Sequence, residues 1–118
     1  MKILSTLFTL LSILVLTNGC EKENSDNWQT LKQLHKTFKN GEIDECIYNG
    51  QTVYCAGLNA YDAGSSVYDK DGNVIGSCNY AWARVDSICQ QLKECEVVYR
   101  VDNNIWGLPA VDKYGLAK

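Results

Sequence analysis

The stretch IDECIYNGQTVYCA, residues 43–56, decides the fold because it predicts a β-hairpin. Strand-forming residues stand on both sides of Asn49-Gly50, the dipeptide that most strongly favours a two-residue turn. A type I′ turn on this dipeptide places Cys46 opposite Val53. A type II′ turn one residue later places Cys46 opposite Cys55, where the two could bridge. The register of the hairpin therefore decides one possible disulfide.

A second hairpin is predicted further along the chain. Val67-Tyr68 and Val74-Ile75 read as strands, and Gly72 in the turn between them can take the positive φ that a tight turn with a bulge requires. The turn is acidic, which invites comparison with a calcium loop. Aligning Gly72 with the glycine of an EF-hand loop puts Cys78 where a bidentate carboxylate is needed, so the sequence predicts an ordinary turn.

Two helices are predicted on either side of the hairpins. The first is amphipathic, starts after Ser25 or Asp26 and stops at Asn40-Gly41. The second runs from residue 81 to residue 94 because apolar side chains recur there at helical spacing. The apolar positions of the first helix are Trp28, Leu31, His35 and Phe38, and those of the second are Ala81, Val85, Ile88 and Leu92.

The remaining segments complete an α+β prediction. Residues 96–101 alternate like a strand, residues 56–65 read as a loop, and residues 102–118 form a loop-rich tail that lies across the domain. We therefore expect one globular domain over residues 27–118, a length that leaves no room for two cores. Its fold is a small antiparallel sheet of two hairpins plus a strand, packed by two helices and stapled by disulfides.

The N-terminal segment has the features of a secretory signal peptide. Lys2 gives a basic start, Ile3–Leu16 form an apolar run, and Gly19 is a small residue ahead of Cys20. A helix made from this apolar run would be about 21 Å long, which is too short for a hydrocarbon core of about 30 Å. A permanent transmembrane anchor is therefore not expected.

The stretch that ends at Cys20 resembles the signal of bacterial lipoproteins. By this resemblance residues 1–19 are a lipoprotein signal peptide, Cys20 becomes the lipid-modified first residue, and residues 20–26 form a polar tether similar to the surface-export signal of Bacteroidota-type lipoproteins. The resemblance implies a lipid anchor in the cell envelope, at the outer membrane, on either its periplasmic or its surface face. Ordinary signal-peptidase cleavage stays open, since Thr17 and Gly19 form a small-x-small pair.

Export places the cysteines in a compartment where disulfides persist. A lipid-modified Cys20 cannot pair, so two disulfides and one free thiol are expected, whereas an unmodified Cys20 allows three disulfides. Within the second predicted helix Cys89 and Cys95 point in different directions, so Cys78 is the better partner for one of them. The disulfide candidates are Cys46, Cys55, Cys78, Cys89 and Cys95.

The part after the signal resembles small uncharacterised bacterial lipoprotein domains. The shared patterns are a Gly-x-x-Val-Tyr strand, here Gly50–Tyr54, and a Tyr-Asp-x-Asp-Gly-Asn turn, here Tyr68–Asn73. Both patterns are structural, so the resemblance implies the two hairpins and no activity.

Charge and side-chain chemistry exclude several functional classes. Without residues 1–19 the chain has ten basic and fourteen acidic residues, a net charge of −4 that does not favour nucleic acid. The single His35 lies on a helix face without a recognisable nucleophile, and the cysteine intervals match no zinc site. We predict no metal, no cofactor and no catalytic residues. An unrecognised acid pair is the enzyme alternative, with Asp62 and Asp102 as its best candidates. The full set of candidate carboxylates is Asp44, Glu45, Asp62, Asp86, Asp102 and Asp112.

A binding role is the remaining prediction. Tyr61 and Trp106 lie in glycine- and asparagine-rich loops and are candidates for exposed contacts with a glycan or a protein. The sequence thus predicts a non-catalytic, lipid-anchored envelope protein that binds an unidentified ligand. The first alternative is an inhibitor of a secreted hydrolase such as a lysozyme or protease, acting through a rigid loop. A small hydrolase is the second alternative.

Overall fold

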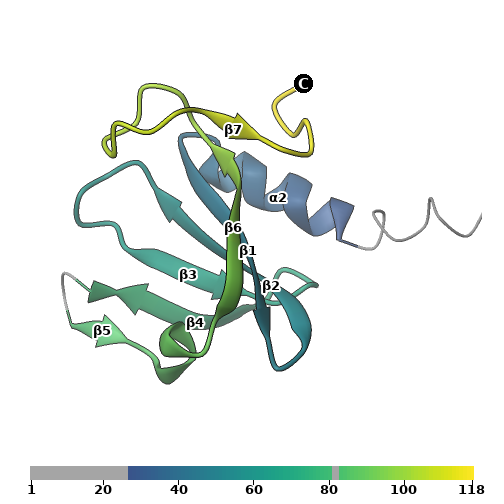
Figure 1. Ribbon diagram of the computed structural model, residues 1–118, viewed down its shortest axis with the longest axis vertical. Helices are drawn as coiled ribbons and strands as arrows, with labels where there is room; N and C mark the ends of the chain where they lie inside the picture. Colours follow the sequence, from purple (N-terminus) through teal and green to yellow (C-terminus); the bar gives the residue numbers. More distant parts are fainter. Residues whose placement is uncertain (1–26, 81–82) are drawn as a thin grey trace, which may run out of the picture.

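A computed structural model describes residues 27–80 and 83–118 (Figure 1). The predicted signal peptide, Cys20 and the tether lie outside these residues. The described part contains one α-helix, one short 3₁₀ helix and one seven-stranded antiparallel sheet of order β5-β4-β3-β2-β1-β6-β7. The elements are α2 (Trp28–Phe38), β1 (Gly41–Tyr48), β2 (Gln51–Leu58), β3 (Ser65–Tyr68), β4 (Val74–Asn79), β5 (Arg84–Val85), η2 (Ser87–Gln90), β6 (Lys93–Arg100) and β7 (Val111–Asp112).

The first hairpin, β1–β2, has the type I′ register. Asn49 and Gly50 take φ values of 50° and 74°, as this turn requires at both central positions. Cys46 consequently lies opposite Val53, and the alternative register that places Cys46 opposite Cys55 is wrong. A one-residue slip would also move every side chain of the strand to the other face.

The second hairpin, β3–β4, is confirmed. Gly72 has a φ of 88°, and the pairing shifts by one residue next to Tyr68, which is the expected bulge. Asp69 organises the turn, because its Oδ1 accepts hydrogen bonds from the backbone N–H of Asp71 and Asn73, each at 2.9 Å. The backbone and side-chain bonds from Asn73, together with those from the rest of the turn, lower the pKa of Asp69.

The second predicted helix is wrong over the described part of residues 81–94. Residues 84–85 instead form β5 and residues 87–90 form η2, and β6 begins at Lys93. Local apolar spacing fits a helix, but the chain here pairs with β4 rather than with itself. Only one α-helix packs on the sheet in the part of the chain that the structure describes.

Contacts with β4 explain this departure. Val85 pairs with Cys78 in the sheet, and a disulfide joins Cys78 to Cys89. The N–H of Ser77 donates to Oδ2 of Asp86 at 2.8 Å, and the N–H of Asp86 donates to the carbonyl of Ser77 at 3.0 Å. These bonds between distant residues satisfy groups that a helix would have bonded locally.

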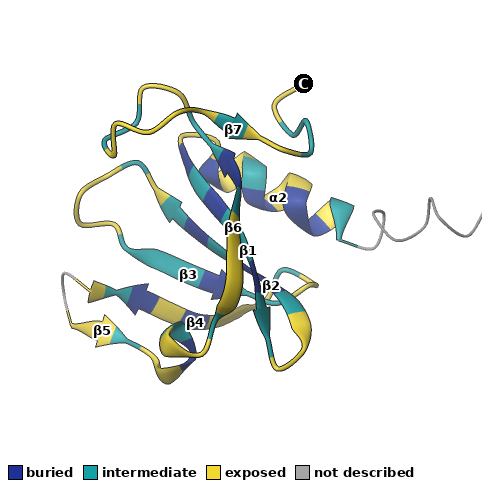
Figure 2. Cartoon of the chain, viewed as in Figure 1, coloured by how far each residue is buried: buried dark blue, intermediate teal, exposed yellow. Residues whose placement is uncertain are grey.

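The sheet has a core on each face. On one face α2 packs its buried side against the centre of the sheet, as predicted for its amphipathic pattern (Figure 2). On the other face the strands β1–β4 and η2 enclose a smaller core. The first core contains Leu31, Leu34, Phe38, Ile43, Tyr54, Ala56, Val98 and Tyr99, and the second contains Cys46, Val53, Val67, Cys78 and Ile88.

The C-terminal tail lies across the domain, as predicted. β7 pairs with β6, and Tyr114 and Leu116 pack against the core beneath α2. The predicted strand over residues 96–101 is confirmed as part of the longer β6. The hydroxyl of Tyr99 on this strand donates to the carbonyl of Lys39, just after α2, which ties the helix end to the sheet.

Two disulfides are present in the described residues, Cys46–Cys95 and Cys78–Cys89, and Cys55 is free. The first joins the neighbouring strands β1 and β6, and the second joins β4 to η2. Of the two partners considered for Cys78, Cys89 is the one that the structure selects. Among the described helices none is long and apolar enough to cross a membrane.

Candidate functional site

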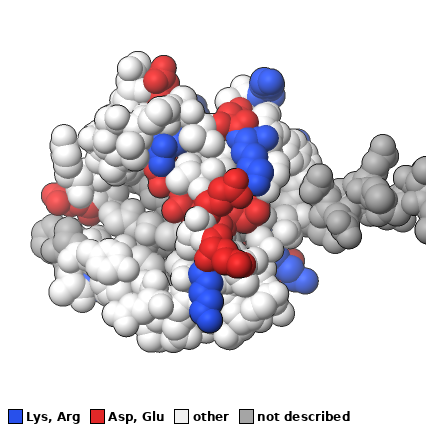
Figure 3. Space-filling view, viewed as in Figure 1, with Lys and Arg blue, Asp and Glu red and all other residues white. Residues whose placement is uncertain are grey.

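A hollow of about 330 Å³ brings together the two residues that the sequence singled out for binding, Tyr61 and Trp106. It lies on the sheet face that α2 does not cover. Side chains alternate along a strand, so Asp44 faces the hollow while its neighbour Ile43 faces α2. Figure 3 shows the surface hollowed at the left of the view.

Three aromatic side chains stand around this hollow. Their exposed fractions are 84% for Tyr61, 69% for Tyr80 and 39% for Trp106, and Leu58 beside them is 48% exposed. They come from three separate places in the chain: the β2–β3 loop, the end of β4 and the β6–β7 connection. Exposed aromatic groups gathered at a concave surface are typical of recognition sites.

Side-chain amides hold the backbone of these loops. Oδ1 of Asn59 accepts a hydrogen bond from the N–H of Ile105 at 2.7 Å and so ties the β2–β3 loop to the β6–β7 connection. Asn104 donates through Nδ2 to the carbonyls of Val101 and Leu108, both at 2.8 Å. The backbone that carries Tyr61 and Trp106 is therefore fixed before any ligand arrives, which lowers the entropic cost of binding.

Two carboxyl groups, Glu42 and Asp44, line the hollow from alternate positions of β1. Glu42 accepts from Nε of Arg100 at 2.7 Å, and this ion pair is largely shielded, with the side chains 23% and 11% exposed. Burial raises the pKa of Asp44 to about 7, and its hydrogen bond and charge repulsion with Glu42 add to the effect, while Arg100 opposes it. Oδ1 of Asp44 is buried and has no hydrogen-bond partner among the described residues.

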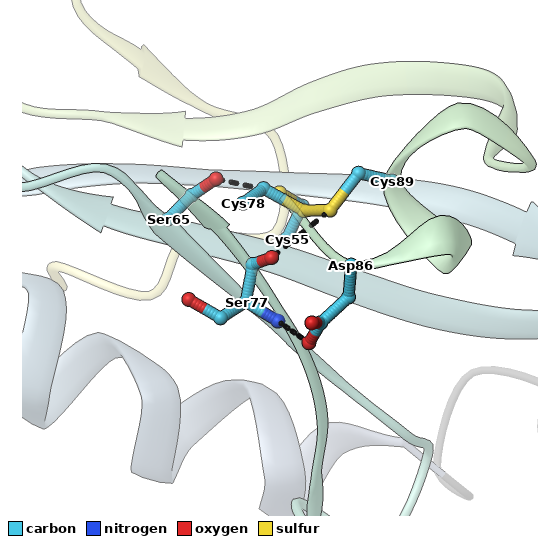
Figure 4. The surroundings of a disulfide bond; sticks show 6 residues. All are labelled: Cys55, Ser65, Ser77, Cys78, Asp86 and Cys89. Carbon is cyan, nitrogen blue, oxygen red and sulfur yellow. Dashed lines mark hydrogen bonds between the residues drawn. A yellow bond between two sulfur atoms is a disulfide. The ribbon is translucent and has the colours of Figure 1, made fainter. Parts of the chain in front are cut away.

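Cys55 lines the same hollow from β2, directly across from Asp44 in the sheet. Its Sγ–H donates to Oγ of Ser65 at 3.3 Å, and the side chain packs against the core that contains Cys78 (Figure 4). Burial is the main cause that raises the pKa of the Cys55 thiol. The group is therefore protonated near neutral pH and contributes a small apolar surface rather than a nucleophile.

The two best candidates for an unrecognised hydrolase, Asp62 and Asp102, lie on different loops. Asp62 is exposed in the β2–β3 loop, where its carbonyl accepts from Nδ2 of Asn79, and Asp102 is exposed after β6, where its Oδ1 accepts from the N–H of Asn103. His35 contacts the ring of Tyr99 edge-on at 4.7 Å between centroids, a packing role. Within the described ranges no three His, Cys, Asp or Glu residues form a metal-binding group.

A second cavity, of about 380 Å³, lies on the α2 side of the sheet. Two of its polar groups bond to each other, because the hydroxyl of Tyr114 lies 3.1 Å from both carboxylate oxygens of Glu45. Its aromatic wall includes Tyr54, which is fully buried as part of the main core. These contacts stabilise the fold, so we take the hollow on the opposite face as the candidate site.

Sequence reasoning missed Glu42 and Tyr80 as members of the site, and it considered Asp44 only as one carboxylate of a possible hydrolase. The sequence could have placed these two carboxyl groups on one face of the sheet, because residues two apart on a strand share a face. The type I′ register then places Asp44 beside Cys55. The sequence offered no such placement for Tyr80, since this residue only precedes the helix predicted over residues 81–94. No protein-family model, curated protein or solved structure matches the chain significantly.

Proposed function

We propose that this chain is a non-catalytic cell-envelope protein, anchored through a lipid on Cys20, that binds a glycan or protein ligand in the hollow beside Tyr61, Tyr80 and Trp106. One observation carries the proposal: three aromatic side chains from three separate connections stand exposed around one concave surface. Such rings offer large contact areas at a small cost in conformational entropy.

The proposed location rests on different observations. The N-terminal segment resembles a lipoprotein signal, and the two disulfides favour a compartment in which thiols are oxidised. Lipid attachment to Cys20 would place the protein at the outer membrane. The intact mass of the protein taken from its native envelope tests this directly, since an N-terminus at Cys20 with added acyl mass is expected and an unmodified N-terminus would refute the anchor.

Binding can be tested by tryptophan fluorescence. Titration with envelope fractions and with a panel of glycans is expected to change the emission of the wild-type protein, because Trp106 stands at the edge of the hollow. Trp106→Phe should remove most of the change. Tyr61→Ala and Tyr80→Ala should each weaken binding by about tenfold or more, as for aromatic residues central to an interface.

Val74→Ala is the matched control. Val74 is 64% exposed on β4 but lies outside the hollow, so this variant should bind as the wild type does. The proposal fails if the variants at Tyr61, Tyr80 and Trp106 bind envelope components as tightly as the control.

The β2–β3 loop gives specific support to a second function, inhibition of a secreted hydrolase. Tyr61 is the most exposed large side chain at the hollow, and its loop is fixed on both sides through Asn59 and through the Asp62 carbonyl. A rigid, projecting loop is what an inhibitor inserts into an active site. Inhibition assays against lysozymes and proteases would support this function if Tyr61→Ala abolished inhibition; a wild-type protein without effect on the whole panel would exclude these targets.

A further inference from the structure

The charge of the hollow restricts what it can bind. Its only strongly charged lining groups among the described residues are the acids Glu42 and Asp44, and no lysine, arginine or histidine lines it. Arg100, which lies outside the lining, is already paired with Glu42. Asp44 is therefore the lining acid that is not in direct ion-pair contact with this arginine.

The geometry points to a small ligand that carries an aliphatic ammonium group, seated with that group against Asp44 and with its apolar part against the aromatic rings of the rim. This inference rests on the proposed binding function and adds the chemical class of the ligand. The volume of about 330 Å³ lies within the range of small-molecule sites.

Both parts of the ligand have matching groups in the hollow. A primary ammonium has three N–H donors, and the carboxyl groups of Asp44 and Glu42 in the lining supply acceptor oxygens for them. The faces of Trp106, Tyr61 and Tyr80 suit an apolar frame and add cation–π attraction near the charge. An anionic ligand would meet two acids and no base among the described lining residues, so the same site rejects it.

Binding should also depend on pH, because the ammonium favours the ionised form of Asp44. The charged and titratable groups that face Asp44 are Glu42 on its own strand, Arg100 on β6 and Cys55 on β2. Asp44 exchanges its proton near pH 7, so ligand binding should displace that proton. Affinity should rise by about thirtyfold between pH 5.5 and pH 8, because the ionised share of Asp44 rises from about 3% to about 90%.

The test uses 2-phenylethylamine and its neutral analogue 2-phenylethanol as probes on the full chain, by isothermal titration calorimetry. The amine, like that of lysine with a pKa of about 10.4, stays charged over this pH range. The amine is expected to bind more than about tenfold more tightly than the alcohol, with proton release at pH 7 detected from the buffer dependence of the heat. Asp44→Asn should remove both the preference and the proton release.

Asp71→Asn, in the β3–β4 turn away from the hollow, is the control and should leave the preference unchanged. Equal affinity for the two probes, or no binding of either, overturns the ammonium inference. The proposed function is judged separately, because the fluorescence response to envelope fractions and its loss in Trp106→Phe do not depend on these probes. Retention of the preference in Asp44→Asn would also overturn the inference, and circular dichroism of that variant confirms that it is folded.

Discussion

Cys46 on β1 and Cys95 on β6 are joined by a disulfide across 49 residues of sequence. It links the neighbouring strands β1 and β6, and its long loop contains the turns of both hairpins. The second disulfide, Cys78–Cys89, closes a loop of only 11 residues. In the chain-entropy account a longer loop restricts the unfolded chain more, so the first bond should stabilise by about 4 kcal/mol and the second by about 3 kcal/mol.

Removing each disulfide in turn should therefore show which of the two bonds stabilises the fold more. We expect Cys46→Ala/Cys95→Ala to lower the free energy of unfolding more than Cys78→Ala/Cys89→Ala, by about 1 kcal/mol. The comparison is matched, because each pair contains one buried cysteine, Cys46 at 1% and Cys78 at 5% exposure. Urea unfolding followed by circular dichroism measures both. The reverse order would show that native packing around η2, and not loop length, dominates.

The thiol of Cys55 should be alkylated slowly in the folded protein. Its raised pKa leaves little thiolate at pH 7.5, and the side chain is only partly exposed. Alkylation by iodoacetamide, located by peptide mapping without reduction, should be at least about tenfold slower in buffer than in urea at the same pH. Equally rapid alkylation in buffer and in urea would show that the fold does not shield this thiol. Cysteines 46, 78, 89 and 95 should stay unmodified in both conditions.

Gly76 leaves room for η2 against β4. A Cβ built on Gly76 would lie 2.4 Å from Cγ2 of Ile88, a distance that real contacts do not reach. Gly76→Ala should lower stability by about 1–3 kcal/mol because the side chain of Ile88 must move out of the second core. The measurement is the urea midpoint.

A double-mutant cycle isolates this contact. Ile88→Ala alone should lower stability because it leaves a cavity. Adding Gly76→Ala to this variant should lower stability little further, because Cγ2 of Ile88, the atom that the new Cβ would meet, is no longer present. Strict additivity of the two changes would mean that the clash at Gly76 is not with Ile88.

Because of Asp44, the folded protein should be less stable above pH 7 than at acidic pH. Its pKa is raised from 3.8 in the reference state to about 7 in the fold, so the folded protein binds the proton more tightly than the unfolded chain. This contribution to stability is fully present below pH 4 and is lost as pH rises through 7. With allowance for solvent screening, the loss from this group is about 2 kcal/mol.

Asp44→Asn should abolish that part of the pH dependence, as measured by urea unfolding at pH 5 and pH 8. Glu42→Gln should have a smaller effect in the same direction, since the charge of Glu42 contributes to the raised pKa of Asp44. A wild-type protein and an Asp44→Asn variant with parallel stability profiles between pH 5 and pH 8 would refute the assignment.

The sequence predicted the elements whose pattern is local. Asn49-Gly50 and Gly72 fix tight turns through their own backbone preferences, and the spacing from Trp28 to Phe38 predicts the helix that covers the main core. The helix predicted over residues 81–94 failed because the apolar side chains there are held by distant partners. Ile88 lies against Gly76, and Cys89 is bonded to Cys78, neither of which local spacing can reveal.

The candidate site was predicted in part. Tyr61 and Trp106 were singled out as exposed loop aromatics, and the hollow contains both. Their meeting depends on Asn59, whose amide reaches the N–H of Ile105 across 46 residues of sequence. The acidic lining was missed because the environment of Asp44 depends on which strand lies next to β1, and only the assembled sheet defines it.

The chain enters the fold at Trp28, at the end of α2 that lies away from the loops around the hollow (Figure 1). This end of the described chain therefore lies apart from the mouth of the hollow. This arrangement would be the same whether the chain were held by a biotin tag on a sensor surface or by a lipid in a bilayer. Under the proposed function, the fold would therefore hold the hollow on the side of the domain away from the point of attachment.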